Sequence, residues 1–161
     1  MGDDKSMPSF EEDFRNSREN GVPVKYKDWE LIRTDRIPVQ KKFSGTLRII
    51  STNSEWYQGV CLQVLNGKIK TVLGEGKSFC IWEDYMDGAI FTFEGISKDL
   101  QLCVYNAWEQ TAWTGQPYTN SWQEGAAMIV EVDGNTRRYR CNDGHPDDNF
   151  DDIIFEVTIN E

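Results

Sequence analysis

The sequence lacks any apolar run long enough for a membrane span or for the core of a secretory signal peptide. Basic residues are also scarce: 17 lysines and arginines stand against 27 aspartates and glutamates, so the net charge is −10. Nucleic acids and anionic membranes bind basic surfaces, so we expect neither as a partner and no membrane insertion. We expect a cytoplasmic protein, or one exported without a classical signal peptide.

Motifs built on cysteine and histidine are missing as well. The four cysteines show no CxxC spacing, and His145 is the single histidine, so a zinc site is not expected. In a reducing compartment the cysteines would be buried free thiols; Cys61 and Cys103 both lie in predicted strands, so a disulfide between them is the alternative. We do not expect an enzyme, because His145 beside Asp143 is the one candidate general base and a lone loop histidine more often caps a turn.

What the sequence does have is a series of short apolar runs separated by turn signals. The predicted strands lie near 46–51, 59–65, 68–73, 78–82, 89–94, 100–106, 126–132, 137–141 and 153–159. The pair Asn66-Gly67 predicts a two-residue hairpin turn. We therefore predict an all-β fold, an antiparallel β-sandwich of about nine strands of Greek-key type.

Two segments lie outside this pattern. Residues 1–29 are polar and lack sustained periodicity, so we expect an extension that is mobile, with a short docking helix through Phe10 and Phe14 as the alternative. Residues 30–161 then form the folded domain. Within it, segment 107–125 holds three tryptophans and is predicted to be a long loop. Its aromatic side chains either pack on the sheet or stack on a ligand.

The segment from Asn142 to Asp152 is crowded with carboxylates. It holds five aspartates and two asparagines, and an alternating strand follows it directly. Hard oxygen donors at this density suit Ca²⁺, although a solvated acidic turn without a ligand is the alternative. The EF-hand pattern does not match, since Asp152 stands at its glycine position and Thr158 at its final glutamate position.

The acidic run Asp143-Gly144-His145-Pro146-Asp147-Asp148-Asn149-Phe150-Asp151-Asp152 resembles the calcium loop of the small bacterial calcium-mediated lectins that bind fucose and mannose. A second patch agrees, since Ile50-Ser51-Thr52-Asn53-Ser54-Glu55-Trp56 resembles the strand and Asn-Ser loop of that family. The resemblance covers residues 43–161. It implies a nine-stranded sandwich in which bound calcium takes vicinal sugar hydroxyls as ligands.

The resemblance also implies roles for individual residues, with one or two Ca²⁺ per chain. Its calcium ligands correspond to Asn53, Asn142, Asp147, Asn149, Asp151, Asp152 and Glu161. Its sugar contacts correspond to Asn53, Ser54, Glu55, Asp143, Asp147, Asp151 and Asp152. The sequence departs from the family at Asn142, where the family has Glu, and at Asn149, where it has Asp. Pro146 lengthens the spacer by one residue.

The family implies a homodimer or a tetramer as well, because its terminal carboxylate reaches a calcium of the partner chain. Glu161 stands nine residues past Asp152. A strand that rises ~3.3 Å per residue carries Glu161 about 30 Å from Asp152, so it reaches its own loop only if the chain bends back. The sequence thus predicts a calcium-dependent carbohydrate-binding protein. The alternative is a calcium-stabilised β-sandwich that binds or adheres to other proteins without binding sugar.

Overall fold

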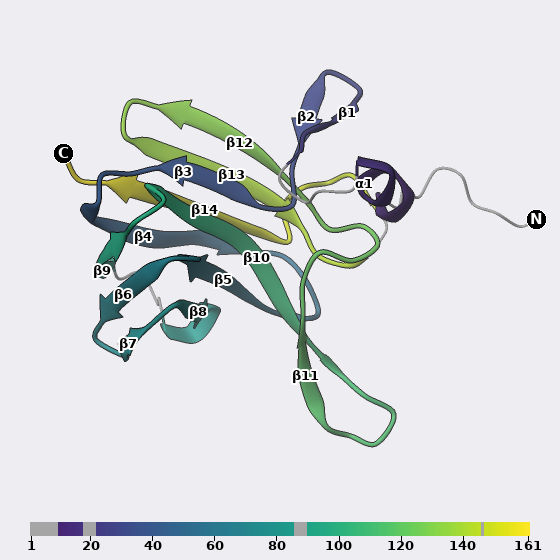
Figure 1. Ribbon diagram of the computed structural model, residues 1–161. Coiled ribbons are helices and arrows are strands. Elements are labelled where there is room, and N and C mark those ends of the chain that lie inside the picture. The colour runs from purple at the N-terminus through teal and green to yellow at the C-terminus, as the bar shows by residue number, and fades with distance from the viewer. Residues whose placement is uncertain (1–9, 18–21, 86–89, 146) are drawn as a thin grey trace, which may run out of the picture.

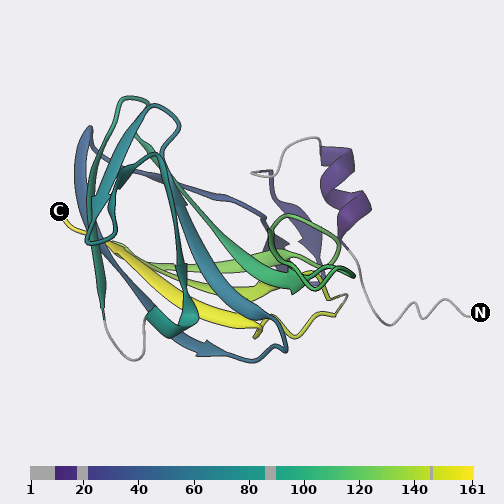
Figure 2. The ribbon, with the colours of Figure 1, turned by 90° about the horizontal axis from the view of Figure 1, so that it is seen from below.

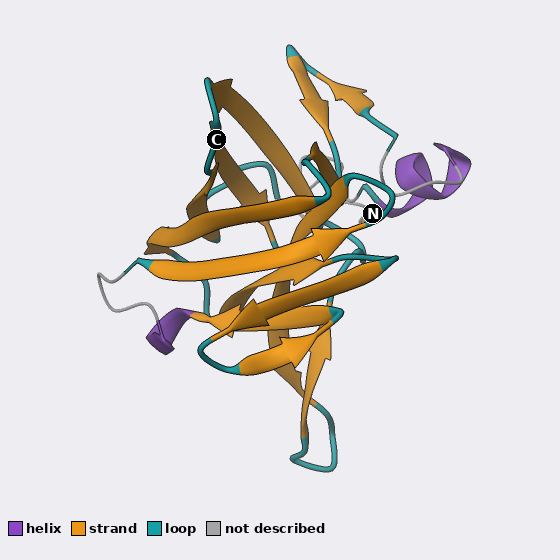
Figure 3. Cartoon of the chain, turned by 60° about the vertical axis from the view of Figure 1, so that its left-hand side comes forward, coloured by secondary structure: helices purple, strands orange, loops and turns teal. Residues whose placement is uncertain are grey.

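The computed structural model describes residues 10–17, 22–85, 90–145 and 147–161, and strands dominate these residues (Figures 1 and 3). Two large antiparallel sheets form a sandwich, which confirms the predicted fold class. The described residues contain fourteen strands, more than the predicted number of about nine. None of the helices in the described ranges has the length and apolar character needed to span a bilayer.

The first sheet has five strands, four of which follow the order β11-β10-β5-β8. The fifth, β3, lies on the same side of β10 as β11: β11 pairs with the end of β10 and β3 with its beginning. Its strands are β3 (Asp35–Pro38), β5 (Tyr57–Gln63), β8 (Ser78–Trp82), β10 (Gln101–Thr111) and β11 (Pro117–Asn120). The short 3₁₀ helix η1 (Glu83–Tyr85) follows β8.

The second sheet has seven strands in the order β12-β13-β14-β4-β9-β6-β7. Its strands are β4 (Lys42–Thr52), β6 (Gly67–Thr71), β7 (Gly74–Gly76), β9 (Phe91–Ser97), β12 (Ala127–Asp133), β13 (Thr136–Asn142) and β14 (Ile153–Ile159). In β14, the alternation of the sequence matches the two faces of the strand. Ile153, Phe155 and Val157 are fully buried between the sheets, and the residues between them are more exposed.

The predicted hairpin at Asn66-Gly67 is wrong. β5 belongs to the five-stranded sheet and β6 to the seven-stranded sheet, so the chain crosses from one sheet to the other at this turn. Gly67 has a φ of 156°, and a Cβ built on it would lie 1.8 Å from the carbonyl oxygen of Ile96. Glycine is therefore required by a close approach to β9 and not by a two-residue turn.

The segment 107–125, which was predicted to be a loop, is largely a β-hairpin formed by the end of β10 and by β11. β10 continues to Thr111, and β11 returns beside it with Thr111 opposite Pro117 and Trp108 opposite Asn120. Figures 1 and 3 show this hairpin projecting beyond the sandwich. We call residues 109–120 the tryptophan arm, because Trp113 lies at its tip.

The described part of residues 1–29 is folded against the domain. Helix α1 (Glu11–Ser17) and the hairpin of β1 (Val24–Tyr26) and β2 (Trp29–Leu31) replace the mobile tail that we expected there. Phe10 and Phe14 are 1% and 2% exposed in a second core cluster that includes Phe150 of the acidic segment. Burial of two aromatic side chains supplies the free energy that the polar composition of this segment did not suggest.

The cysteines are paired differently from our expectation of four free thiols. Cys61 and Cys80 are directly opposite each other in β5 and β8 and form a disulfide. Cys103 and Cys141 are free and buried. Cys103 lies opposite Gln63, so the register of β10 and β5 does not place it beside Cys61.

Candidate functional site

The acidic loop (residues 143–152, with 146 outside the described residues) connects β13 to β14 at one end of the sandwich, close to α1 (Figures 1 and 2). Asn142 fastens the loop from inside. Its Oδ1 accepts a hydrogen bond from the Phe150 amide at 2.8 Å, and its Nδ2 donates to the Asp147 carbonyl at 2.8 Å. Asn142 was predicted to bind metal, but in this conformation its side chain is fully buried and holds the loop backbone.

Asp143 is the structural centre of the loop. Its carboxylate is fully buried and accepts four hydrogen bonds. Ser54 Oγ and Gln58 Nε2 donate to Oδ2 at 2.5 and 3.0 Å. The backbone amide of His145 lies 2.9 Å from Oδ1, as does His145 Nδ1. The predicted contact from Asp143 to a sugar is therefore not available in this conformation, because both oxygens are inside the protein.

The structure does bring the Asn53–Ser54 loop to the acidic loop, as the sequence predicted. Asn53 Nδ2 donates to Asp151 Oδ2 at 2.9 Å, and the Asn53 amide donates to the Asp152 carbonyl at 3.0 Å. Asp152 Oδ2 in turn accepts the Asp143 amide at 2.9 Å. Residues almost one hundred positions apart in the sequence thus present oxygen atoms at one end of the sandwich.

Negative charge at this end is poorly neutralised. The pKa of Asp152 is raised to about 7: burial raises it most, the carboxylates of Asp143 and Asp147 also raise it, and the hydrogen bond from the Asp143 amide lowers it. Burial also raises the pKa of Asp147, and Asp143 and Asp151 act in the same direction. A raised carboxyl pKa means that the ionised form is disfavoured, here by burial first and by the neighbouring carboxylates second. A bound cation would relieve this repulsion.

Other predicted residues are placed elsewhere. Asp148, to which the sequence assigned no ligand role, turns away from the loop and contacts Lys27 Nζ at 2.8 Å and Tyr26 Oη at 3.0 Å. Asn149 is exposed, and its amide contacts Asp147 Oδ1 at 3.2 Å. Glu161 lines a groove at the opposite end of β14, so within one chain it does not belong to the site.

Glu55 lies on the rim of the site. It lines a groove of about 320 Å³ together with Ser54, Trp56, Tyr57 and residues of η1. Aromatic walls with carboxylates beside them are typical of surfaces that bind sugar rings, because a ring face packs on the aromatic side chain and its hydroxyls donate to carboxylates.

An aromatic column supports the acidic loop from behind. The Trp56 ring stacks on His145 at 3.8 Å between centroids and on Trp108 at 6.1 Å. A Cβ on Gly144 would lie 3.0 Å from the Trp108 ring, so the loop backbone is pressed against this column. Sequence reasoning did not assign Trp56, Trp108 or the buried Gln58 to the site. Trp56 directly follows the Asn-Ser loop, which is the one signal that pointed to it.

The N-terminal segment holds the loop from the other side. Phe150 has a φ of 53°, which is unfavourable for a phenylalanine, and its ring is 1% exposed. The Trp29 ring meets it edge-on at 5.3 Å and the Phe10 ring lies at 6.2 Å. Packing by Phe10, the residue before α1, and by Trp29 of β2 therefore holds Phe150, and with it the acidic loop, in this conformation.

The geometry and the donor chemistry of the acidic loop bear differently on calcium binding. Within residues 10–17, 22–85, 90–145 and 147–161, no three histidine, cysteine or acidic side chains converge closely enough to hold a metal ion. The donor chemistry does fit, because calcium prefers hard oxygen ligands. The half-exposed carboxylates of Asp147 and Asp151, the buried carboxylate of Asp152 and the side-chain carbonyl oxygen of Asn53 are all of this kind. The raised pKa of Asp152 fits as well. Binding would require Asp147 and Asp151 to turn toward Asp152.

Comparison of this chain with protein-family models, with curated proteins and with solved structures gave no match. The resemblance of the acidic loop to that of the calcium-mediated lectins therefore stays a prediction from the sequence.

Proposed function

We propose that this protein binds carbohydrate in a calcium-dependent manner at the end of the sandwich formed by the acidic loop and the Asn53–Ser54 loop. One observation carries the proposal: Asn53, Asp151 and Asp152 meet through hydrogen bonds at a place where burial and neighbouring carboxylates raise the pKa of Asp152 to about 7. Oxygen donors from distant segments and uncompensated negative charge together favour a divalent cation.

In this proposal the residues divide into ligands and framework. Asn53, Asp147, Asp151 and Asp152 would hold the ion through their side-chain oxygens. Asn142 and Asp143 form the framework, since both are fully buried and hydrogen-bonded to the loop backbone. When bound, calcium supplies open coordination positions for two vicinal sugar hydroxyls. Carboxylate oxygens nearby accept the hydroxyl protons as charge-assisted hydrogen bonds.

Sugar preference is assigned to Ser54, Glu55 and the aromatic wall of Trp56 and Tyr57, which line the neighbouring groove. Mannose and fucose are the first sugars to test, because they present vicinal hydroxyls suited to a calcium ion. Any ligand role of Glu161 requires a second copy of the chain, as in a homodimer or a tetramer, because Glu161 lies at the far end of β14.

The test compares two variants in the presence of calcium and of EDTA. Asp152→Ala should remove both the rise in melting temperature caused by Ca²⁺ and the binding of mannose or fucose on a glycan array. Asp133→Ala, at the exposed last residue of β12, should keep both. Mg²⁺ should stabilise much less than Ca²⁺, since it prefers a smaller octahedral site. Absence of any stabilisation by millimolar Ca²⁺ would exclude the proposal.

The alternative function is a calcium-stabilised module that contacts other proteins. The tryptophan arm favours it, because the arm exposes a large aromatic side chain, Trp113, at its tip. Calcium stabilisation together with a blank glycan array would support this alternative over sugar binding.

A further inference from the structure

The groove beside the acidic loop begins next to the proposed calcium site. It measures about 320 Å³. The residues that line it are Ser54, Glu55, Trp56, Tyr57, Glu83 and Asp84. None of these is among the four proposed calcium ligands, but Ser54 directly follows one of those ligands, Asn53. The ion site and the groove are therefore neighbours that do not overlap, and a single sugar on the ion does not fill the groove.

One wall of the groove presents an aromatic ring. Tyr57 is half-buried, and its ring stacks on Trp82 of β8 with 5.2 Å between the ring centroids. Trp82 fills the space over Gly59, since a Cβ built on Gly59 would lie 2.6 Å from the Trp82 ring. Trp82 thus backs one face of Tyr57 and leaves the other face for the groove. An aromatic ring held in this way can pack against the apolar face of a sugar.

Another wall of the groove is η1, which is fixed to the strands around it. Glu83 Oε1 accepts a hydrogen bond from the Gln58 amide at 2.8 Å, and Oε2 accepts one from the Thr52 hydroxyl at 3.0 Å. The Cys61–Cys80 disulfide joins β5 to β8 shortly before η1 begins. Because these walls are already ordered, the groove loses little conformational entropy when a ligand fills it.

The charge of the groove distinguishes between classes of sugar. Glu55 and Asp84 are exposed, and no lysine or arginine is among the described residues that line the groove. Carboxylates accept hydrogen bonds from sugar hydroxyls, and they repel carboxylate or sulfate groups on a ligand. A neutral sugar therefore fits this groove better than an acidic one.

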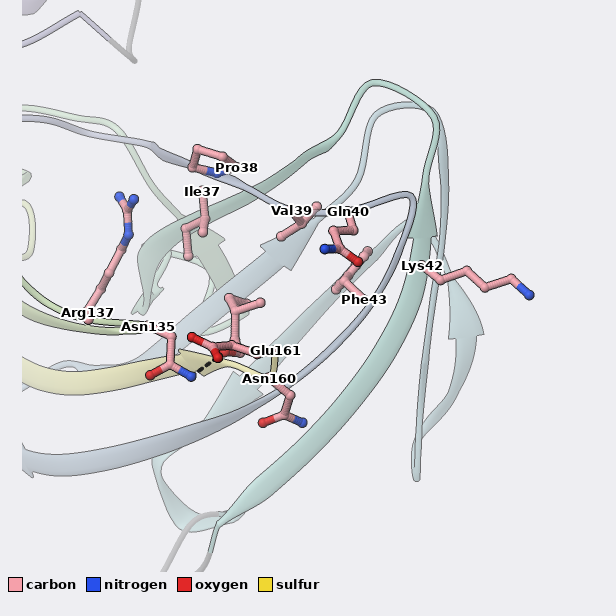
Figure 4. Close-up of a pocket in the computed structure, with 12 residues that line it drawn as sticks. Ile37, Pro38, Val39, Gln40, Lys42, Phe43, Asn135, Arg137, Asn160 and Glu161 are labelled. Atoms are coloured by element: carbon pink, nitrogen blue, oxygen red, sulfur yellow. Dashed lines mark hydrogen bonds between the residues drawn. The ribbon is translucent and has the colours of Figure 1, made fainter.

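The larger groove at the other end of β14 does not offer the same surface (Figure 4). It measures about 650 Å³, but the aromatic residue in its lining, Phe43, is 7% exposed and presents little of its ring. The seven residues of β14 also separate this groove from the acidic loop by about 23 Å. A sugar bound to the ion therefore continues into the smaller groove beside Ser54 and not into this one.

We propose that the ligand is a neutral oligosaccharide, with one unit bound to the calcium ion and the next unit packed on Tyr57 in the smaller groove. This inference rests on the proposed function and adds the class of sugar to it. A volume of about 320 Å³ lies near the lower limit for sites that bind small molecules, which is room for one unit. Packing on the ring and hydrogen bonds to Glu55 and Asp84 should make a disaccharide bind about tenfold more tightly than its terminal monosaccharide.

Isothermal titration of the full chain in Ca²⁺ tests this with methyl mannoside, methyl fucoside, mannobioses of each linkage and neutral fucosylated disaccharides. At least one disaccharide should bind about tenfold more tightly than the monosaccharide at its end. An equal gain for disaccharides with a carboxylate or sulfate on the second unit would overturn the assignment of a neutral ligand. If monosaccharides bind and no disaccharide binds more tightly, this inference alone is wrong. If no sugar binds in Ca²⁺, the proposed function fails and the inference fails with it.

Substitutions in the groove locate the second unit. Tyr57→Ala should make the disaccharide and the monosaccharide bind equally well, whereas Tyr57→Phe, which keeps the ring, should preserve most of the gain. Asp84→Trp should also abolish the gain, because it fills the groove from an exposed position that does not depend on core packing. The matched controls are Tyr118→Ala, at a tyrosine that is 43% exposed, and Asp133→Trp, at the exposed last residue of β12. Both controls should keep the gain. A gain that survives in Tyr57→Ala and in Asp84→Trp overturns the proposal.

Discussion

Asp152→Asn tests the electrostatic reasoning about the acidic loop directly. The Asp152 carboxyl is 6% exposed and accepts the Asp143 amide, while Asp143 and Asp147 oppose its ionisation. Asparagine keeps the size of the side chain and an oxygen that can accept the same hydrogen bond, but it never carries a charge. The variant therefore removes the ionisation and leaves the packing in place.

The pKa of Asp152 rises from its ordinary value of 3.8 to about 7 in the folded protein. Between these two pH values the folded protein binds a proton that the unfolded chain does not, so the free energy of unfolding falls as pH rises through this window. A difference of this size corresponds to about 4 kcal/mol. We expect about 2 kcal/mol, because the carboxyl is part of an interacting group and water reaches part of the loop.

Urea denaturation in EDTA at several pH values between 4 and 8 measures this free energy. The natural chain should lose about 2 kcal/mol across the window, whereas Asp152→Asn should lose much less and be the more stable protein at pH 8. Asp133→Asn, at the exposed last residue of β12, should follow the natural chain. With Ca²⁺ in place of EDTA, the pH dependence should become flatter for the natural chain and for Asp133→Asn, and should change little for Asp152→Asn. Equal pH dependence in all three proteins would refute the reasoning.

Three further predictions concern a buried arginine, the aromatic side chain that anchors the acidic loop, and the disulfide. Arg33→Lys should lower the free energy of unfolding by about 2–4 kcal/mol in urea denaturation, because the buried guanidinium donates to three backbone carbonyls that one ammonium group cannot all reach. The exposed Arg138→Lys should cost much less. Phe150→Ala should cost about 3–5 kcal/mol and weaken calcium binding, and a cost below about 1 kcal/mol would mean that the N-terminal segment does not hold the loop. Without reductant, the unfolded protein should show two free thiols by mass spectrometry, and Cys61→Ala with Cys80→Ala should lower stability by about 3 kcal/mol.

The sequence predicted the strands well where side chains alternate between a buried and an exposed face. The predicted strand at 153–159 matches β14, in which buried and more exposed residues alternate. The predicted strand at 78–82 matches β8, although its residues do not alternate in burial. β1, β2, β3, β7 and β11 were not predicted, because each has only three or four residues. A run of that length is too short for a period of two to stand out from the sequence around it.

The candidate site shows the same division. The sequence predicted that Asn53 and Ser54 approach the acidic loop, and the hydrogen bonds to Asp151 and Asp143 confirm this placement. It did not predict that Asp143 is fully buried or that Lys27 contacts Asp148. Burial and partners depend on side chains that arrive from distant segments, and one sequence does not reveal their register.

By itself, the sequence determined the strand-rich composition, the acidic loop before the last strand and the excess of negative charge. The tertiary structure alone decided that Asn66-Gly67 leads from one sheet to the other and that Phe10 docks on Phe150. It also decided that Asp152 lies among carboxylates that raise its pKa. The physical reason is range: alternation and turn chemistry act between neighbours in the sequence, whereas pairing, burial and electrostatic repulsion act between neighbours in space.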